Sequence, residues 1–378
     1  MMGSSSARTF TVFGTVFGTV FGAACGALVL LVVLAVPRPT ATLAQPASRT
    51  AQEKLDDLGR LSGAERQKLL EEQAVREGKV VMYAADDPNL IRAWNAEFKK
   101  KYPQIDAQFI RMTTRDMLQR SVNESRAGRP VADLLHPPAS ELAILQRMGL
   151  LARYVSSEAR ELDAEFRDPE GFWTVHWYAP EIVGFNSAVI KGADVPTTLE
   201  GLASPALRGK LGRTSLGGRW VAGVLKVKGE GEGMELLRRI AAQEPRLYES
   251  NTALANALAS GQVAVAFDIH LNNVALLKNR GAPLDYVVPA PLFLLPVYQV
   301  IMKDAPHPAA AALAYDWILS KQGQAVYKPL DQMGPRNDTE YPGTDVMKSA
   351  KSLVSLSASL LAEPDRFTKI FEDLFVRK

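Results

Sequence analysis

One short stretch of the sequence, RTSLGGRW, gathers residue types that bind anions. It falls where a predicted strand ends and a predicted helix begins, so its backbone N–H groups would point at a ligand from the positive end of the helix dipole. A neighbouring guanidinium group can hold a carboxylate or phosphate with two parallel hydrogen bonds. The groups on offer belong to Arg213, Thr214, Ser215, Gly217, Gly218 and Arg219. The alternative interpretation is that the hydroxyls only cap the helix.

Acidic and imidazole side chains follow the ends of other predicted strands, at Asp87, His136, Asp268 and His270. Carboxylates together with imidazoles form a donor set that could hold Fe³⁺, Zn²⁺ or Mn²⁺. Because no short spacing such as HxxxH links these residues, we prefer helix capping or a polar cleft wall over a metal site. Thr113, which follows the second predicted strand, joins them as a candidate cleft residue.

Four aromatic side chains lie in or beside two extended, apolar segments: Trp173, Trp177, Tyr178 and Tyr298. Rings in such a place can wall a cleft and stack on a cationic ligand. Plain packing in the core is an equally good interpretation. We take Trp177 as the candidate cleft residue among them.

A repeated order of strand and helix must position these side chains. Apolar, β-branched runs at 79–85, 106–112 and 131–136 alternate with stretches of helical spacing. A second unit follows, with strands at 208–215 and 262–270 and helices between them. This rhythm predicts mainly parallel sheets covered by helices, in which ligands gather at the carboxyl ends of the strands.

The chain has 378 residues, which is long enough for two globular lobes. Its 44 basic and 41 acidic side chains give a net charge of +3. The chain therefore lacks the strong positive electrostatic field that binding to a nucleic acid requires. The single cysteine, Cys25, lies in an apolar leader. The rest of the chain therefore has no thiol for a disulfide, a thiolate metal site or a nucleophile.

The leader predicts export. Arg8 precedes an uncharged stretch from residue 10 to 36, and small residues before Ala44 suit a signal-peptide cleavage site there. Residues 1–44 are thus expected to be a signal peptide. The stretch is also long enough to remain as an uncleaved membrane anchor, which is the alternative. Residues 45–74 predict a polar, helical extension in which Ser62 and Glu65 would form a capping box.

Segments from residue 66 onward resemble, in order, the landmarks of the extracellular solute-binding proteins of ABC importers. They include EGKVVMYAADDPNLIRAWNAEFKKKYP, AGRPVADLL, LASPALRGKLGRTS, ASGQVAVAF and APHPAAAALAYDWILSKQGQAVY. The resemblance is to the group that binds ferric iron, polyamines, thiamine and phosphonates. It implies an α/β, type II periplasmic binding fold whose two lobes are joined by crossing strands at 175–185 and 286–300. Lobe one would comprise 75–184 and 298–378, and lobe two 185–297.

The resemblance also tests the ferric-iron interpretation. Its iron-binding members place a histidine after the first strand, a glutamate after the third and a tyrosine pair after a strand of lobe two. The matching places hold Asp87, Pro138, and Leu271 with Asn272. A tyrosinate iron site is therefore not expected. The family's anion contact matches Thr214 and Ser215.

We therefore expect the substrate-binding component of an ABC importer, which captures a small anionic organic solute of the phosphonate or carboxylate type and passes it to permease subunits. The expected cleft residues are Asp87, Thr113, His136, Trp177, Thr214, Ser215, Gly218, Arg219, Asp268 and His270. A metal ion held by Asp87, His136, Asp268 and His270 with an anion is the first alternative, and a sensing module of a membrane receptor is the second. We expect a periplasmic monomer without a cofactor. We expect no enzyme, because GxSxG, GxxxxGK[ST] and HExxH motifs are absent from the sequence.

Overall fold

The computed structural model describes residues 49–377, apart from residues 358 and 362. The predicted signal peptide, residues 1–44, lies outside the described residues. The chain divides into residues 1–47 and a compact unit from Ser48 to Lys378, which contains both lobes. Among the described helices of this unit, none combines the length and the apolar character needed to cross a bilayer.

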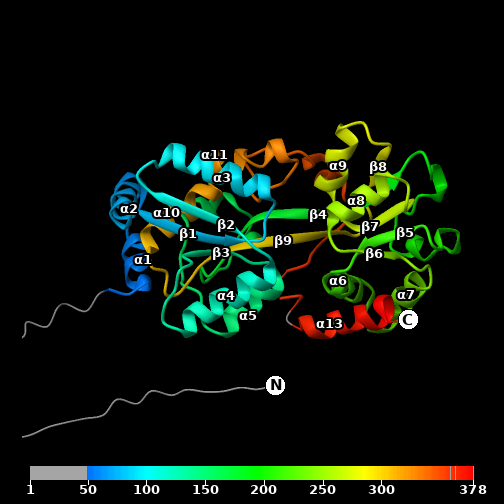
Figure 1. The fold of residues 1–378 in the computed structure, drawn as a ribbon, viewed down its shortest axis with the longest axis horizontal. Coiled ribbons are helices and arrows are strands. Elements are labelled where there is room, and N and C mark those ends of the chain that lie inside the picture. The colour runs from blue at the N-terminus through cyan, green and yellow to red at the C-terminus, as the bar shows by residue number, and fades with distance from the viewer. Residues whose placement is uncertain (1–48, 358, 362, 378) are drawn as a thin grey trace, which may run out of the picture. The chain divides into compact units, whose positions relative to one another are not determined.

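Lobe one is a parallel sheet covered by helices on both faces (Figure 1). Its central strand reads KVVMYA and is buried along nearly its whole length, as expected for a parallel strand with helices on both sides. The elements are β1 Lys79–Ala84, α3 Pro88–Lys101, β2 Asp106–Arg111, α4 Thr114–Arg126, β3 Leu134–His136, α5 Ala139–Arg147, α10 Pro308–Leu319 and α11 Lys321–Ala325. The predicted alternation of strand and helix is confirmed here.

Lobe two repeats the plan with a second parallel set of strands, β7, β5 and β6, in that order. Its elements are β5 Leu211–Thr214, α6 Gly218–Lys228, α7 Glu230–Ala241, β6 Arg246–Tyr248, α8 Asn251–Ala259, β7 Val265–His270, α9 Leu271–Asn279 and β8 Leu284–Val287. Short 3-10 turns occur at Ser157–Glu161, Ala164–Phe166, Gly192–Asp194, Glu200–Ala203, Pro205–Leu207 and Lys328–Leu330.

Two long antiparallel strands, β4 Thr174–Asn186 and β9 Leu292–Ile301, run through both lobes (Figure 1). They join the two parallel sets into one hydrogen-bonded sheet of order β2-β1-β3-β9-β4-β7-β5-β6. β4 lies where the first crossing strand was predicted. The second crossing begins at Leu292, later than predicted, because residues 286 and 287 belong to β8, which pairs with β4, and residues 288–291 form no strand.

The N-terminal extension forms two helices, α1 Ala51–Gly59 and α2 Gly63–Glu77, that pack on α10 of lobe one. The buried Arg66 guanidinium donates a hydrogen bond to the Tyr154 hydroxyl and lies 3.0 Å from the Asp316 carboxylate. The capping box occurs at Thr50 and Glu53, at the start of α1. The expected box at Ser62 is wrong, because that side chain makes no cap hydrogen bond.

The C-terminal segment returns to lobe two. It forms α12 Thr344–Ser349, β10 Leu353–Ser355, α13 Pro364–Phe371 and a π-helical turn Glu372–Val376. β10 pairs with the lobe-two end of β9, and α13 packs on α6. The structure thus differs from the expectation that all of 298–378 belongs to lobe one. The reason is that α13 buries an apolar face, Phe367 and Phe371, which α6 covers.

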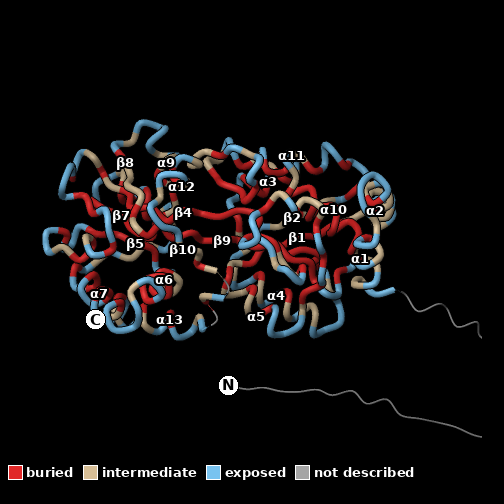
Figure 2. The backbone as a smooth tube through the Cα atoms, turned by 180° about the vertical axis from the view of Figure 1, so that it is seen from behind, coloured by how far each residue is buried: buried red, intermediate tan, exposed pale blue. Residues whose placement is uncertain are grey.

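Buried residues concentrate in α10 and in the inner strands β1, β3, β4, β5, β7 and β9 (Figure 2). Every residue of β9 and every residue of α10 is buried. The crossing strand and this helix therefore form the buried core on which the strand ends and helix starts of the site are mounted.

Candidate ligand-binding site

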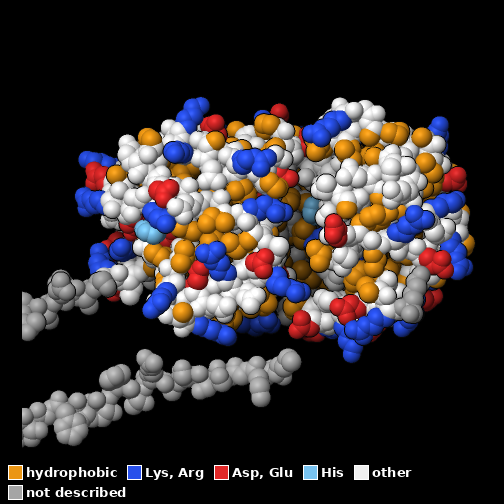
Figure 3. Space-filling model, in the orientation of Figure 1, with side chains coloured by type: hydrophobic (Ala, Val, Ile, Leu, Met, Phe, Trp, Pro, Cys, Tyr) orange, Lys and Arg blue, Asp and Glu red, His pale blue; other side chains and the backbone are white. Residues whose placement is uncertain are grey.

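A cavity of about 740 Å³ lies between the two lobes. The surface is hollowed between the two halves in Figure 3. Lobe one contributes the first turns of α4 and α5, and lobe two contributes the start of α6, one residue of β9 and one side of α13. The polar and charged lining residues are Thr114, Arg115, Ser140, Glu141, Ser215, Arg219, Asp365, Thr368 and Glu372.

The first turns of α5 and α6 reach this cavity without a capping side chain. The residues at their N-caps, Pro138 and Gly217, make no side-chain hydrogen bond. The first N–H groups of an α-helix have no partner inside the helix, and the helix dipole makes them favourable partners for an anion. Two such helix starts, one from each lobe, therefore line the same space, although the Glu141 carboxylate already bonds its own N–H in the first turn of α5.

The starts of α3 and α4 differ, because side chains cap them. The Asp87 carboxylate accepts from the Asn89 N–H at 2.7 Å, and the Thr113 hydroxyl oxygen accepts from the Asp116 N–H. Neither side chain lines the cavity between the lobes. The structure thus places the predicted ligand residues Asp87 and Thr113 as helix caps.

The two glycines at the start of α6 make room for the chain's own C-terminal helix. A Cβ atom on Gly217 would lie 2.2 Å from the Phe371 ring, and one on Gly218 would lie 3.0 Å from the Thr368 backbone. From the sequence, a ligand was expected to make this close approach. In the structure α13 occupies much of that space, and the edge of α13 becomes a wall of the cavity.

Arg213 and Thr214 point into lobe two and away from the cavity. The Arg213 guanidinium donates to Asp268 at 2.6 Å, and both side chains are fully buried. Four aromatic rings, including that of Phe371, lie within about 5 Å of the guanidinium carbon. The Thr214 hydroxyl lies 3.5 Å from Asp268. Of the predicted ligand residues, Asp268 thus belongs to a buried charge pair beneath the site, and the Thr214 hydroxyl lies against it.

Arg219 connects this buried pair to the cavity. Its Nε lies 3.3 Å from the Glu181 carboxylate, which is buried within β4. Burial raises the pKa of Glu181 well above its usual range, and the neighbouring Asp268 raises it further. His270 lies opposite Glu181 in the β4–β7 ladder. Enclosure of the ring, with Arg219 nearby, lowers the pKa of His270 to about 3. Its imidazole is therefore neutral at physiological pH.

Glu141 faces Arg219 from the lobe-one side of the cavity. It accepts a hydrogen bond from the Ser140 hydroxyl. Burial raises the pKa of Glu141, and Arg219 acts in the opposite direction. An acidic and a basic side chain thus face each other across the space between the lobes.

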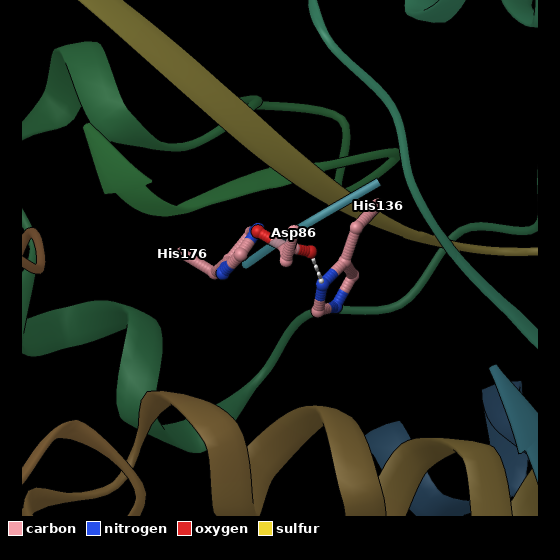
Figure 4. A group of neighbouring side chains, drawn as sticks. All are labelled: Asp86, His136 and His176. Atoms are coloured by element: carbon pink, nitrogen blue, oxygen red, sulfur yellow. Dashed lines mark hydrogen bonds and ion pairs between the residues drawn. The ribbon is translucent and has the colours of Figure 1, made fainter. Parts of the chain in front are cut away.

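A second polar cluster lies within lobe one, around Asp86 (Figure 4). Asp86 Oδ2 lies 3.0 Å from His136 Nδ1, and Asp86 Oδ1 accepts from the Trp177 indole N–H at 2.7 Å. His176 Nε2 lies 3.8 Å from the same Oδ1. The Trp177 ring contacts the ring of His270 edge to face, with centroids 6.3 Å apart. The predicted residues His136 and Trp177 are thus together, and Trp177 links this cluster to lobe two.

The predicted metal set of Asp87, His136, Asp268 and His270 does not gather around one point. Within the described part of the chain, the one group of acidic, histidine or cysteine ligands close enough to share an ion is Asp86, His136 and His176. His136 is common to both sets. The correction has a simple cause: Asp87 turns outward to cap α3, and Asp268 is held by Arg213.

Residues 142–339, more than half of the chain, match the model of the bacterial extracellular solute-binding protein family. The chain belongs to this family. The expected resemblance is confirmed, and with it the place of the chain as the solute-binding part of an ABC importer, which takes up a small molecule outside the cytoplasm for a membrane permease.

Other proteins resemble this solute-binding protein in sequence or in fold. An uncharacterized protein of Haemophilus influenzae is 26% identical over 265 residues, which is 65% of this chain and 74% of the relative. Iron-bound HitA from Pseudomonas aeruginosa is 19% identical, with a TM-score of 0.69 over 78% of this chain and 99% of HitA. AfuA from Actinobacillus pleuropneumoniae, with fructose-6-phosphate bound, is 20% identical, with a TM-score of 0.69 over 79% of this chain and 98% of AfuA. The predicted two-lobed type II periplasmic binding fold is confirmed.

Seven residues that carry charge or imidazole at or beneath the cleft of this solute-binding protein are not among the predicted cleft residues: Asp86, Arg115, Glu141, His176, Glu181, Asp365 and Glu372. Three of them had a signal. His176 and Glu181 are polar residues inside an apolar run that had to be a buried strand, and such residues need partners. Asp86 stands beside Asp87, and only the backbone geometry shows which of the two turns inward. Glu141 lies in an ordinary helical pattern and had no signal.

Proposed function

We propose that this solute-binding protein captures a small anionic organic solute, of the phosphonate or carboxylate type, in the cavity between its lobes. The observation that carries the proposal is the pair of uncapped helix starts, α5 from lobe one and α6 from lobe two, that line one cavity. An anion there would accept hydrogen bonds from backbone N–H groups of both lobes at once. Its binding would therefore favour the closed arrangement over an open one.

Two guanidinium groups support the same proposal, Arg115 at the start of α4 and Arg219 at the start of α6. Arg219 is held from behind by Glu181, so less side-chain freedom is lost when it grips an anion. Hydroxyl groups of Ser140, Ser215 and Thr368 add neutral donors.

The cavity also carries carboxylates, at Glu141, Asp365 and Glu372. These groups accept hydrogen bonds, so they suit a solute that has hydroxyl or amine groups in addition to its anionic end. The proposal is thus a solute with one acidic end and at least one donor group.

A thermal-melting panel tests the proposal. The purified protein is melted with phosphonates, carboxylates, polyamines and metal ions, and a bound solute at a hundred times its dissociation constant adds about 2.7 kcal/mol of stability. We expect an anionic organic solute to raise the midpoint. Arg219→Ala should abolish that rise, and Arg208→Ala, which removes an exposed arginine outside the cavity, should keep it.

The proposal is wrong if polyamines or metal ions alone raise the midpoint and Arg219→Ala leaves that rise unchanged. Small-angle scattering gives a second test, because capture by two lobes should reduce the radius of gyration. Identical curves with and without the stabilising solute would contradict closure.

Metal as the transported cargo is the second candidate. Three of the described residues favour it, because their ligand atoms lie close enough together to share one metal ion: Asp86, His136 and His176. All three belong to lobe one and their side chains are at most 1% exposed. Closure of the lobes would add no ligand to such an ion, so cargo metal is supported less well than an anionic solute. A sensing module of a membrane receptor remains the third candidate, and it would require the leader to be retained.

We further propose that the protein is a monomer. We also propose that it binds its solute without turnover, as expected from the absent catalytic motifs. Prolonged incubation of the stabilising solute with protein, followed by mass spectrometry of the solute, tests the second point. Mass analysis of the mature N-terminus distinguishes a protein cleaved after Ala44 from one anchored by residues 10–36.

A further inference from the structure

The cluster around Asp86 has the composition and arrangement of a metal site that is separate from the solute cavity. Its members come from three elements of lobe one: Asp86 follows β1, His136 ends β3, and His176 lies in β4. None of the three lines the cavity between the lobes. Their candidate ligand atoms all lie within 4.8 Å of one another.

The spacing of the donors suits one small ion. His136 Nδ1 lies 3.0 Å and His176 Nε2 lies 3.8 Å from the nearer oxygen of Asp86. Ligand atoms about 2.0 to 2.2 Å from a shared Zn²⁺ lie roughly 3.3 to 3.6 Å from one another. The observed separations lie on either side of this range, so small side-chain movements would complete the geometry. Both imidazoles are turned toward the carboxylate in Figure 4.

A β-bulge brings the third donor to this place. The β4–β9 register shifts between Val175 and Trp177, so His176 is the extra residue of the bulge. Successive residues of a regular strand point to opposite faces, whereas a bulge changes the direction of a side chain. Because of it, His176 and Trp177 both lie near Asp86 Oδ1. The backbone is thus irregular at the position that completes the donor set.

The hydrogen bonds of the cluster leave imidazole nitrogens without partners. His136 Nε2 and His176 Nε2 are buried and make no hydrogen bond. His176 Nδ1 lies 2.9 Å from the Tyr327 hydroxyl. In the tautomer whose Nδ1–H donates to that hydroxyl, Nε2 carries a lone pair that faces a carboxylate oxygen, whereas in the other tautomer Nε2 carries the proton. Two lone pairs facing each other in a dry interior repel, and a cation between them removes that repulsion.

The surroundings match those of protein-bound metals. Tyr327 and Trp177 orient His176 and Asp86 by hydrogen bonds from outside the donor set. The Trp94 ring contacts both imidazoles and closes the site from the apolar side.

From this geometry we propose that Asp86, His136 and His176 bind a divalent transition-metal ion that stays in lobe one. Two imidazoles with one carboxylate suit Zn²⁺ or Fe²⁺ and are a poor set for Ca²⁺ or Mg²⁺. The ion joins the carboxyl ends of β1 and β3 to the bulge of β4, and it fixes the carboxylate that holds Trp177 against His270. It is a structural ion beneath the cleft and not the transported solute.

Zn²⁺ binding to the chelator-treated protein tests the proposal. After dialysis against Zn²⁺, elemental analysis should find one tightly held ion per chain, and Zn²⁺ but not Mg²⁺ should raise the melting midpoint. Asp86→Asn and His176→Gln should each weaken Zn²⁺ binding by at least about 100-fold. Tyr327→Phe, which removes only the hydroxyl that orients His176, should weaken it by about 10-fold.

The matched control is His307→Gln. His307 also lies in lobe one and also faces a carboxylate, Asp133, but it is outside the cluster, so its loss should leave Zn²⁺ binding unchanged. Arg219→Ala should leave it unchanged too, which separates this site from the solute cavity. Co²⁺ substituted into the wild-type protein should show the intense visible bands of a low-coordinate site.

The proposal is overturned if the wild-type protein holds no stoichiometric Zn²⁺, or if Asp86→Asn and His176→Gln both bind it as the wild type does. If these variants do not fold, the Co²⁺ spectrum of the wild type decides. A spectrum of the hydrated ion alone would overturn the proposal.

Discussion

The start of α6 gives the sharpest stability prediction, because Gly217→Ala adds one methyl group to a fully occupied space. The new Cβ would lie 2.2 Å from Phe371 and 2.5 Å from the Arg213 guanidinium. The backbone at Gly217 has φ −91°, which any residue adopts, so the substitution brings no conformational strain. Its entire cost would come from the collision with α13 and the buried guanidinium.

Two routes give similar magnitudes. If the neighbours adjust in place, overpacking costs about 1 to 3 kcal/mol. If Phe371 leaves its buried position instead, the lost burial of the ring costs about 1.5 to 3 kcal/mol. We therefore expect Gly217→Ala to lower the free energy of unfolding by about 1 to 3 kcal/mol.

Urea unfolding followed by tryptophan fluorescence measures this change, and the chain offers a matched control. Gly231 lies in α7, and a Cβ there would meet nothing within 4 Å. Gly231→Ala should therefore stabilise the protein by about 0.5 to 1 kcal/mol, because alanine loses less backbone entropy in a helix. The two Gly→Ala changes thus have opposite expected signs.

A double-mutant cycle identifies the partner. Phe371→Ala alone should cost about 3 to 5 kcal/mol. In that background Gly217→Ala should cost less than it does in the wild type, since the colliding ring is gone and only the approach to the Arg213 guanidinium remains. The interpretation that α13 packs into the start of α6 would be refuted if Gly217→Ala were as harmless as Gly231→Ala, or if its cost were the same in both backgrounds.

Three further predictions concern buried or paired charges. Asp268→Asn should cost about 3 to 5 kcal/mol in urea unfolding, because it leaves the Arg213 charge buried and unpaired, while asparagine tolerates the positive φ at this position. Because burial raises the pKa of Glu181, the folded state holds a proton that the unfolded state loses above about pH 4.3. Stability should therefore fall as pH rises above that value, and Glu181→Gln should flatten this part of the profile. Asp133 raises the pKa of His307, so that pair stabilises the fold fully below about pH 6.5 and loses its effect as pH rises through the raised pKa; His307→Gln should remove this dependence.

The framework of both lobes could be predicted because strands buried on both faces read as apolar runs. β1, β4 and β9 are of this kind, and each lies where the sequence indicated a strand. The return of α13 to lobe two could not be predicted. Phe367 and Phe371 at a spacing of four show that one face of a helix needs cover, but they do not say which surface supplies it.

The candidate site was predictable by position and not by orientation. The ends of strands did gather polar groups, yet Asp87 caps a helix while its neighbour Asp86 turns into the core. Adjacent residues in a loop can exchange these roles with a small change in backbone dihedrals, which composition and spacing do not encode. The role of His176 depends on a bulge, and a bulge arises from the pairing of two strands that lie far apart in sequence.

The crossing strands contain one proline each at almost the same level: Pro180 in β4 pairs with Leu294, and Pro296 in β9 pairs with Tyr178. A proline has no N–H to donate to the neighbouring strand, so this part of the sheet has fewer backbone hydrogen bonds than its length allows. Bending of the ribbon there breaks fewer hydrogen bonds than bending elsewhere. Amide exchange of β4 and β9 should accordingly be fastest on either side of these prolines, and each lobe should move as a stiff body about them.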